Sequence, residues 1–323
     1  MSRVLLVGAG LMGQWHAHAC RAAGATLLGV VDPDKSRATS LGGPGVETFQ
    51  SLEAALLVKS PRVVHICSPV AQHADDARRA LEAGAHVIIE KPVTEELETT
   101  LSLVALAESR GVSITPVHQF PFQAWASEIQ ALGSILRLEH AICSAGADGK
   151  TETTKASLAL GIAWHGLSLA ERILPPGGLR GAQWHVMGQR PGEITATTTS
   201  HGTAVSLSVS LAGRPPRNEL TVVGSDGTLR ADLFHGFGRV DRSGISRRDK
   251  VLAPFRRASG DLASAATNLG RRAKNREQAF PGLQALVAAA HKHADGQGEP
   301  PLPHSHLIDV ATAAQALVEG STG

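Results

Sequence analysis

Three glycines near the start of the chain constrain its fold more than any other feature. Gly8-Ala9-Gly10-Leu11-Met12-Gly13 fits the pattern G-x-G-x-x-G and stands between a short apolar run, residues 4–7, and a helical pattern over residues 14–23. In a strand–turn–helix unit the first glycine permits a tight turn, the second lets the backbone approach a pyrophosphate, and the third lets helix and strand pack closely. The start of the helix offers free N–H groups and a positive dipole end to phosphates. The pattern therefore predicts a dinucleotide site at Gly8, Gly10, Leu11, Met12 and Gly13.

An acidic residue supports this interpretation. Asp32 follows the second expected strand, residues 26–31. It stands roughly 20 residues after the last glycine, where a carboxylate that binds ribose hydroxyls belongs. The alternative is a plain glycine turn and an ordinary aspartate at a strand end. Because a carboxylate repels a 2′-phosphate, we expect NAD as cofactor, with NADP possible because Lys35 and Arg37 lie close by.

The pattern of elements divides the chain in two. Expected strands at residues 26–31, 62–67, 86–89 and 112–117 alternate with helical stretches, which implies right-handed crossovers and a doubly wound parallel sheet. After about residue 120, short β-rich runs between residues 183 and 234 favour a largely antiparallel sheet, and helices are expected near 155–174, 281–295 and 305–319. The predicted fold class is α/β: a Rossmann domain over residues 1–120, then an α+β domain over residues 121–323 that binds substrate, carries an open, mostly antiparallel sheet and forms oligomers.

Composition excludes several classes of protein. The formal net charge is +2, too near neutral to favour nucleic-acid binding by the chain as a whole. Cys20, Cys67 and Cys143 are too few and too far apart for a disulfide framework or a zinc site, and an odd count suits a reducing cytosol. The apolar run at residues 4–7 is too short for a signal peptide or a membrane span. We expect a cytoplasmic protein without a membrane partner.

The many histidines do not form a metal-binding pattern. The chain has 15 of them. His291 and His293 are two apart on an expected helix and would not share a face, and His304 and His306 stand in a loop without an acidic or Cys partner nearby. We expect no metal site.

One segment differs in charge from the rest. Residues 243–276 hold nine Lys or Arg and two acidic residues. Such a run is either a handle for an anionic substrate or partner, or a solvated segment or oligomer contact.

A lysine ends one of the expected strands. Glu90-Lys91-Pro92 follows residues 86–89, and ligands bind at the carboxyl edge of parallel sheets. A lysine there could hydrogen-bond a substrate oxygen or assist a proton transfer, although the tripeptide alone could also be a charged strand end.

Several motifs together resemble the Gfo/Idh/MocA family, the group of glucose–fructose oxidoreductase and inositol dehydrogenase. The matching residues are Ser68-Pro69, His73, the run 80–87 and Glu90-Lys91-Pro92, with His16 in the first helix and 224–229 as a Gly-rich hairpin. The resemblance implies NAD or NADP, hydride transfer, and a homodimer or homotetramer built on the second sheet. It also implies cofactor contacts at Ser68, Pro69, His73, Glu90 and Lys91, a cis Lys91–Pro92 peptide, and Lys91 as a catalytic residue.

The second domain departs from the family pattern. The family commonly has an Asp-x-x-x-His pair on a helix; the counterpart here keeps His165 but has Gly161 at the Asp position. Ser168 stands where a further Asp is often found, and residues 117–123 lack the family's usual Arg. We take Lys91 and His165 as catalytic, and we expect His118, Gln123 and Trp164 at the substrate, where core packing is the alternative for His118 and Trp164.

Three functions follow as hypotheses. The first is hydride transfer between nicotinamide and a carbinol carbon of a sugar, cyclitol or related polyol. The second is reduction of an imine or a conjugated double bond, which Gly161 favours because the proton relay must then differ. The third is a non-catalytic, dinucleotide-dependent sensor, against which Lys91 argues.

Overall fold

The computed structural model describes residues 1–144, 149–187, 190–242 and 246–321. The chain divides into two compact units. The first consists of Met1–Gln119 and Leu283–Ala311, and the second of Phe120–Gly282 and the chain from Thr312 onward.

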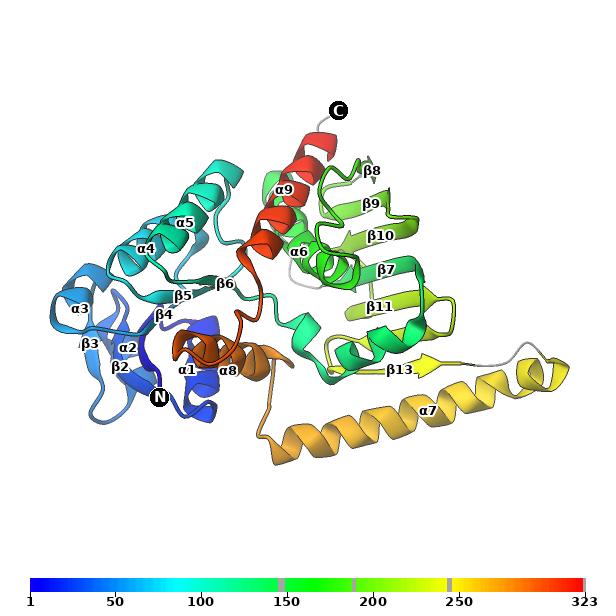
Figure 1. The fold of residues 1–323 in the computed structure, drawn as a ribbon, viewed down its shortest axis with the longest axis horizontal. Helices are drawn as coiled ribbons and strands as arrows, with labels where there is room; N and C mark the ends of the chain where they lie inside the picture. The colour runs from blue at the N-terminus through cyan, green and yellow to red at the C-terminus, as the bar shows by residue number, and fades with distance from the viewer. Residues whose placement is uncertain (145–148, 188–189, 243–245, 322–323) are drawn as a thin grey trace. The chain divides into compact units, whose positions relative to one another are not determined.

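The first unit contains a parallel sheet of six strands in the order β3-β2-β1-β4-β5-β6 (Figure 1). The order reverses between β1 and β4, which is where ligands bind in doubly wound sheets. The predicted Rossmann fold is therefore confirmed. The strands are β1 (Arg3–Val7), β2 (Thr26–Val31), β3 (Glu47–Phe49), β4 (Val63–Ile66), β5 (His86–Ile89) and β6 (Ile114–Pro116).

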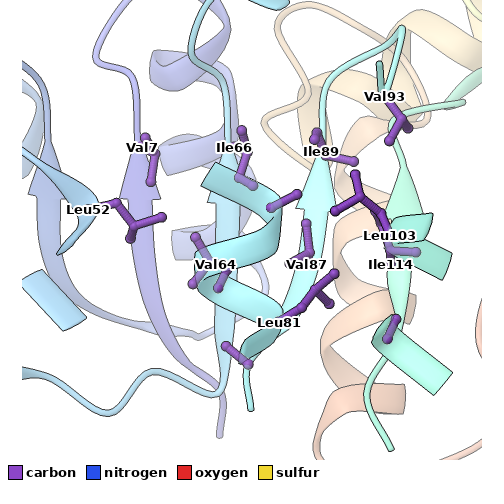
Figure 2. Close-up of a cluster of buried hydrophobic side chains, with 14 of the residues drawn as sticks. Val7, Leu52, Val64, Ile66, Leu81, Val87, Ile89, Val93, Leu103 and Ile114 are labelled. Atoms are coloured by element: carbon purple, nitrogen blue, oxygen red, sulfur yellow. The ribbon is translucent and has the colours of Figure 1, made fainter. Parts of the chain in front are cut away.

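Helices join these strands and cover the sheet. The central strands β4 and β5 are buried and apolar apart from His65 and His86, as expected of strands covered on both faces. Val64, Ile66, Val87 and Ile89 lie in one core (Figure 2). The helices of this unit are α1 (Leu11–Ala22), α2 (Lys35–Gly42), α3 (Leu52–Val58), α4 (Val70–Glu82), α5 (Leu97–Ser109), α8 (Leu283–Ala294) and the start of α9 (His304–Ser321).

Residues 283–311 return to the first unit, although the sequence assigned everything after residue 120 to the second domain. Helix α8 packs against α1 and β5, and Leu307 of α9 belongs to the core of the first sheet. The physical reason is the burial of apolar side chains. Leu286 and Val287 of α8 are fully buried, and the apolar face of this helix is covered by packing in the first unit.

The second unit contains a mixed sheet of seven strands in the order β13-β12-β11-β7-β10-β9-β8. Only β7 and β10 pair in parallel; the other neighbours are antiparallel, so the expected mostly antiparallel sheet is confirmed. The long helix α6 (Glu152–Ile173) packs on β7, β9 and β10. The strands are β7 (Ile135–Cys143), β8 (His185–Met187), β9 (Glu193–Ser200), β10 (Thr203–Ser210), β11 (Arg217–Gly224), β12 (Thr228–Asp232) and β13 (Phe237–Asp241).

The second unit also contains three further helical elements, besides the end of α9. Two 3₁₀ helices, η1 (Phe120–Phe122) and η2 (Ala124–Leu132), open it, and α7 (Arg247–Lys274) packs along β13. Of the basic segment 243–276, residues 243–245 lie outside the described residues; almost all the rest is α7. In the described part of the chain, no helix is long and apolar enough to cross a membrane.

Candidate active site

The glycine loop joins β1 to α1, and its three glycines have different roles. A Cβ on Gly13 would lie 2.0 Å from the Gly8 carbonyl oxygen, and one on Gly8 would lie 2.5 Å from the Cys67 oxygen. Gly8 also has a φ of +91°, which favours glycine. Around Gly10, by contrast, no described atom lies within 4 Å of the Cβ position. Gly8 and Gly13 thus shape the loop, while Gly10 leaves space beside the helix N-terminus that a pyrophosphate would fill.

Asp32 is fixed at the end of β2, beside this loop. It is buried, and one carboxylate oxygen accepts a hydrogen bond of 2.8 Å from the Ala9 N–H. The other oxygen accepts a hydrogen bond of 2.8 Å from the Asp34 N–H, and the Arg37 guanidinium lies 3.6 Å from it. Two backbone N–H donors therefore fix the position of the carboxylate beside the glycine loop.

A pocket of about 700 Å³ lies along the carboxyl ends of the first unit's strands. Most of the predicted cofactor residues line it: Gly8, Gly10, Leu11, Met12, Asp32, Ser68 and Pro69. Arg37, expected close to Asp32, lines it too, whereas Ser51, Glu53, Gln72 and Arg79 line it without having been predicted. Some of these come from the start of α3, which has no strong sequence signal. Gly13, His73, Glu90 and Lys91 are not among its lining residues.

His73 holds two loops together beneath the pocket. It is buried, with one ring nitrogen 2.9 Å from the Pro92 oxygen and the other 2.8 Å from the Ser68 oxygen. Ser68 also donates a hydrogen bond of 2.7 Å to Asp76. Burial raises the pKa of Asp76, and the hydrogen bond from Ser68 opposes that shift. His73 thus positions the Ser68 and Pro92 loops, and its contact with the cofactor stays a prediction.

Lys91 follows β5, and the Lys91–Pro92 peptide is cis, as expected. Burial lowers the pKa of Lys91, and the adjacent Glu90 carboxylate opposes the shift. A lysine with a lowered pKa exchanges its proton more readily near neutral pH.

His118 lies near Lys91 in the same unit. It is 1% exposed, and its Nδ1 lies 3.1 Å from Nε2 of His306. Burial, then His306 and Lys91, hold the pKa of His118 well below its ordinary value. The imidazole is therefore neutral at pH 7. Its Nε2 is buried and has no hydrogen-bond partner in the described part of the chain.

Comparison with known proteins identifies the first unit. The family described as "Oxidoreductase family, NAD-binding Rossmann fold", Gfo/Idh/MocA, matches residues 2–118. The N-terminal domain belongs to the Gfo/Idh/MocA family. It is similar to inositol 2-dehydrogenase of Corynebacterium glutamicum, at 34% identity over 110 residues, and to UDP-N-acetylglucosamine 3-dehydrogenase of Acidithiobacillus ferrooxidans, at 32% over 117 residues.

These alignments span only part of each protein. They cover 33% and 36% of this chain, and the same shares of the two relatives. Two solved structures resemble nearly the whole chain, and each alignment covers 99% of it. One is the WlbA dehydrogenase from Bordetella pertussis in complex with NADH and UDP-GlcNAcA. The other is levoglucosan dehydrogenase in complex with NADH and levoglucosan. The alignments include 95% and 97% of those chains, each with a TM-score of 0.76 and 17% identity. They confirm the predicted two-domain fold.

In the second unit, the predicted substrate residues divide into two kinds. His165 and Trp164 are half-buried on α6; the His165 ring lies 4.7 Å from that of Phe120. Gln123 is buried, its amide nitrogen donates to the carbonyls of Leu233 and Pro281, and its oxygen accepts a hydrogen bond from Trp125. Its amide thus ties the start of this unit to two later segments, and its substrate role stays a prediction.

A chain of buried histidines in the NAD-binding domain was not predicted. Nε2 of His16 lies 3.2 Å from the Glu90 carboxylate, and its Nδ1 lies 2.9 Å from Nδ1 of His65. Nε2 of His65 lies 2.8 Å from Nε2 of His291 and 3.5 Å from the Cys20 sulfur.

The donor atoms of Cys20, His65 and His291 lie within 4.8 Å of one another, so they are placed as metal ligands could be. The 2.8 Å between the two nitrogens is a hydrogen-bond distance, however, and is shorter than the roughly 3.3 Å between two nitrogens of a tetrahedral zinc centre. The geometry is that of a hydrogen-bonded chain ending at Glu90, and the absence of a metal site stays a prediction.

Proposed function

We propose that this chain is an NAD-dependent dehydrogenase that transfers a hydride between nicotinamide and a carbinol carbon of a sugar, cyclitol or related polyol. The observation that carries the proposal is half-buried Lys91, whose pKa burial lowers, near neutral His118 in the same domain as the dinucleotide pocket. The names of the relatives support the substrate class, since they include inositol and UDP-sugar dehydrogenases.

The residues present fit the cofactor. The open space at Gly10 admits a pyrophosphate to the start of α1, and Asp32 presents a fixed carboxylate to ribose hydroxyls. Bound NAD supplies the hydride acceptor for oxidation of the alcohol. Because the Asp32 carboxylate repels a 2′-phosphate, we propose a preference for NAD over NADP. The Arg37 guanidinium lies near this carboxylate and limits how large the preference is.

Side chains of the protein must accept the proton of the substrate hydroxyl. Oxidation of an alcohol to a carbonyl removes a hydride from carbon and a proton from oxygen, so a base must accept that proton. We propose His165 as that base, with Lys91 donating a hydrogen bond to the reacting oxygen and stabilising charge that develops on it. His118 is the alternative base, because it is neutral and its Nε2 lacks a partner in the described part of the chain.

Reduction of an imine or a conjugated double bond is the second candidate. The observation that favours it is Gly161, which places no side chain beside His165 and leaves open space, without a described atom within 4 Å of its Cβ position. The carboxylate that relatives carry at this position is therefore replaced by a glycine, and a different substrate would need a different proton path.

The test is a substrate panel with the purified chain. NAD or NADP is incubated with inositols, free sugars and UDP-sugars, and reduced nicotinamide is followed by absorbance; NADH or NADPH is then incubated with cyclic imines and enones. Reduction of NAD by one of the polyols or sugars supports the first function. Turnover only with imines or enones supports the second, and tight dinucleotide binding without any turnover would leave only the sensor.

A further inference from the structure

Helix α7 exposes the face that a helix on a protein surface usually buries. It runs over 28 residues, Arg247–Lys274. Four of its large apolar side chains lie in solvent: Val251 is 65% exposed, Phe255 73%, Leu262 73% and Leu269 68%. A row of exposed large apolar residues on one helix face marks an interaction site rather than a solvated surface.

The opposite face of α7 is small and polar, and it packs on β13. Gly260 lies against Arg239, the Ser264 hydroxyl donates to the Gly238 oxygen at 3.1 Å, and the Asn268 amide donates to the His235 oxygen at 2.8 Å. Hydrogen bonds thus hold the helix to its own sheet. The four exposed apolar side chains take no part in those hydrogen bonds, and their presence at the surface points to another contact.

The exposed residues follow the spacing of a helix–helix seam. Phe255, Leu262 and Leu269 recur every seven residues, and so do Val251, Ala258 and Ala265. The two rows alternate at steps of three and four residues, which is the a/d pattern of a two-helix interface.

Most basic residues of α7 lie at its two ends, and along the apolar seam between these ends the charges favour a helix over an anionic surface. Between Val251 and Leu269 the basic residues are Arg256 and Arg257. Each is paired within the unit, Arg256 with Asp249 and Arg257 with Asp241, both at 2.9 Å. A lipid headgroup or another anion would therefore have to displace existing ion pairs, whereas an apolar helix would not.

We propose that α7 pairs in antiparallel orientation with α7 of a second copy of this chain. In an antiparallel seam centred near Gly260, Leu262 meets Ala258 of the partner subunit and Phe255 meets Ala265 of the partner subunit. Each large side chain then lies opposite a small one, which fills the interface evenly. A parallel pair would instead stack Phe on Phe and Ala on Ala, leaving gaps between the layers. The proposal does not depend on the proposed enzymatic activity.

The first experiment measures particle mass in solution by sedimentation over a range of concentrations. Leu262→Glu places a charge in the seam, and Ala263→Glu places the same charge one residue along the exposed helix, outside the seam. We expect the wild type and Ala263→Glu to share one mass, and Leu262→Glu to halve it or to raise the dissociation constant at least about tenfold.

The second experiment tests the register by oxidative cross-linking. Ala258→Cys protein, made with a larger tag, is mixed with Leu262→Cys protein. We expect the mixed disulfide to form faster than either symmetric one. Faster symmetric disulfides would overturn the antiparallel arrangement.

Two results of the mass measurement would overturn the pairing itself. One is a wild type that stays monomeric at every concentration. This result would overturn the pairing even if the wild type binds phosphatidylglycerol vesicles and Leu262→Glu does not. The other is an oligomer whose mass is the same in both Glu variants, because its interface would then lie elsewhere.

Discussion

Substitution by alanine at two glycines of the same loop should affect the stability of the protein in opposite directions. Gly10→Ala adds a methyl group where no described atom lies within 4 Å, at a backbone φ of −76° that alanine adopts freely. Gly13→Ala adds the same methyl group 2.0 Å from the Gly8 oxygen. The first change meets only a bound cofactor, and the second meets the protein itself.

The structure sets the size of each effect. At a compatible site Gly→Ala stabilises by about 0.4–1 kcal/mol, because the unfolded chain loses freedom. Gly10→Ala should therefore melt at or slightly above the wild-type temperature, and yet bind NAD at least about tenfold more weakly, a loss of ~1.4 kcal/mol. At Gly13 the clash must be relieved by moving the loop, since nonbonded atoms meet at roughly 3.5 Å; overpacking of this kind costs about 1–3 kcal/mol or more.

The assay is thermal unfolding with and without NAD, together with calorimetric titration of NAD. For a domain of this size, each kcal/mol lowers the melting temperature by roughly 2–4 °C. We expect Gly13→Ala to lose both stability and NAD binding, and Gly10→Ala to lose binding alone. If Gly10→Ala binds NAD as tightly as the wild type, the pyrophosphate does not lie on this loop and our placement of the cofactor is wrong.

Three further predictions follow from the same structure. Asp32→Ala should narrow the preference for NAD over NADP in titrations, and a wild type that binds NADP as tightly as NAD would contradict the role of Asp32. Lys91→Ala and His165→Ala should each lower turnover about 10²–10⁴-fold with NAD affinity nearly unchanged; if His165→Ala keeps normal turnover while His118→Ala does not, His118 is the base. Burial lowers the pKa of His140 to about 4 from 6.5, so the unfolded chain takes up this proton first and the free energy of unfolding should fall by about 3 kcal/mol between pH 6.5 and pH 4. Denaturant titrations should show less of this loss in His140→Gln, and an unchanged pH dependence would refute the buried neutral His140.

Much of the first unit could be predicted because its signals are local. A glycine pattern, an apolar strand before it and an acid after the next strand lie within residues 4–32, and their geometry is set by backbone sterics and short-range hydrogen bonds. The strand β3 (Glu47–Phe49) was missed because three residues carry no periodicity.

The parts that could not be predicted depend on contacts distant in sequence. His65 and His291 meet through the return of α8 to the first sheet, and no spacing along the chain reveals this. The role of Gln123 is set by carbonyls of Leu233 and Pro281. The basic charge of residues 243–276 is evident from the sequence. That the apolar residues of this segment lie on the exposed face of a helix could be seen only in the structure.

We propose that this chain transfers a hydride between bound NAD and a polyol or sugar, with Lys91 donating a hydrogen bond to the reacting oxygen. The decisive experiment measures two quantities for the wild type and for Lys91→Ala: the rate of NADH formation with the best substrate of the panel, and the affinity for NAD. We expect substrate-dependent NADH formation by the wild type, and in Lys91→Ala about 10²–10⁴-fold slower formation at nearly equal NAD affinity. Equal rates in the two proteins, or no NADH from any substrate while NAD binds normally, would contradict it.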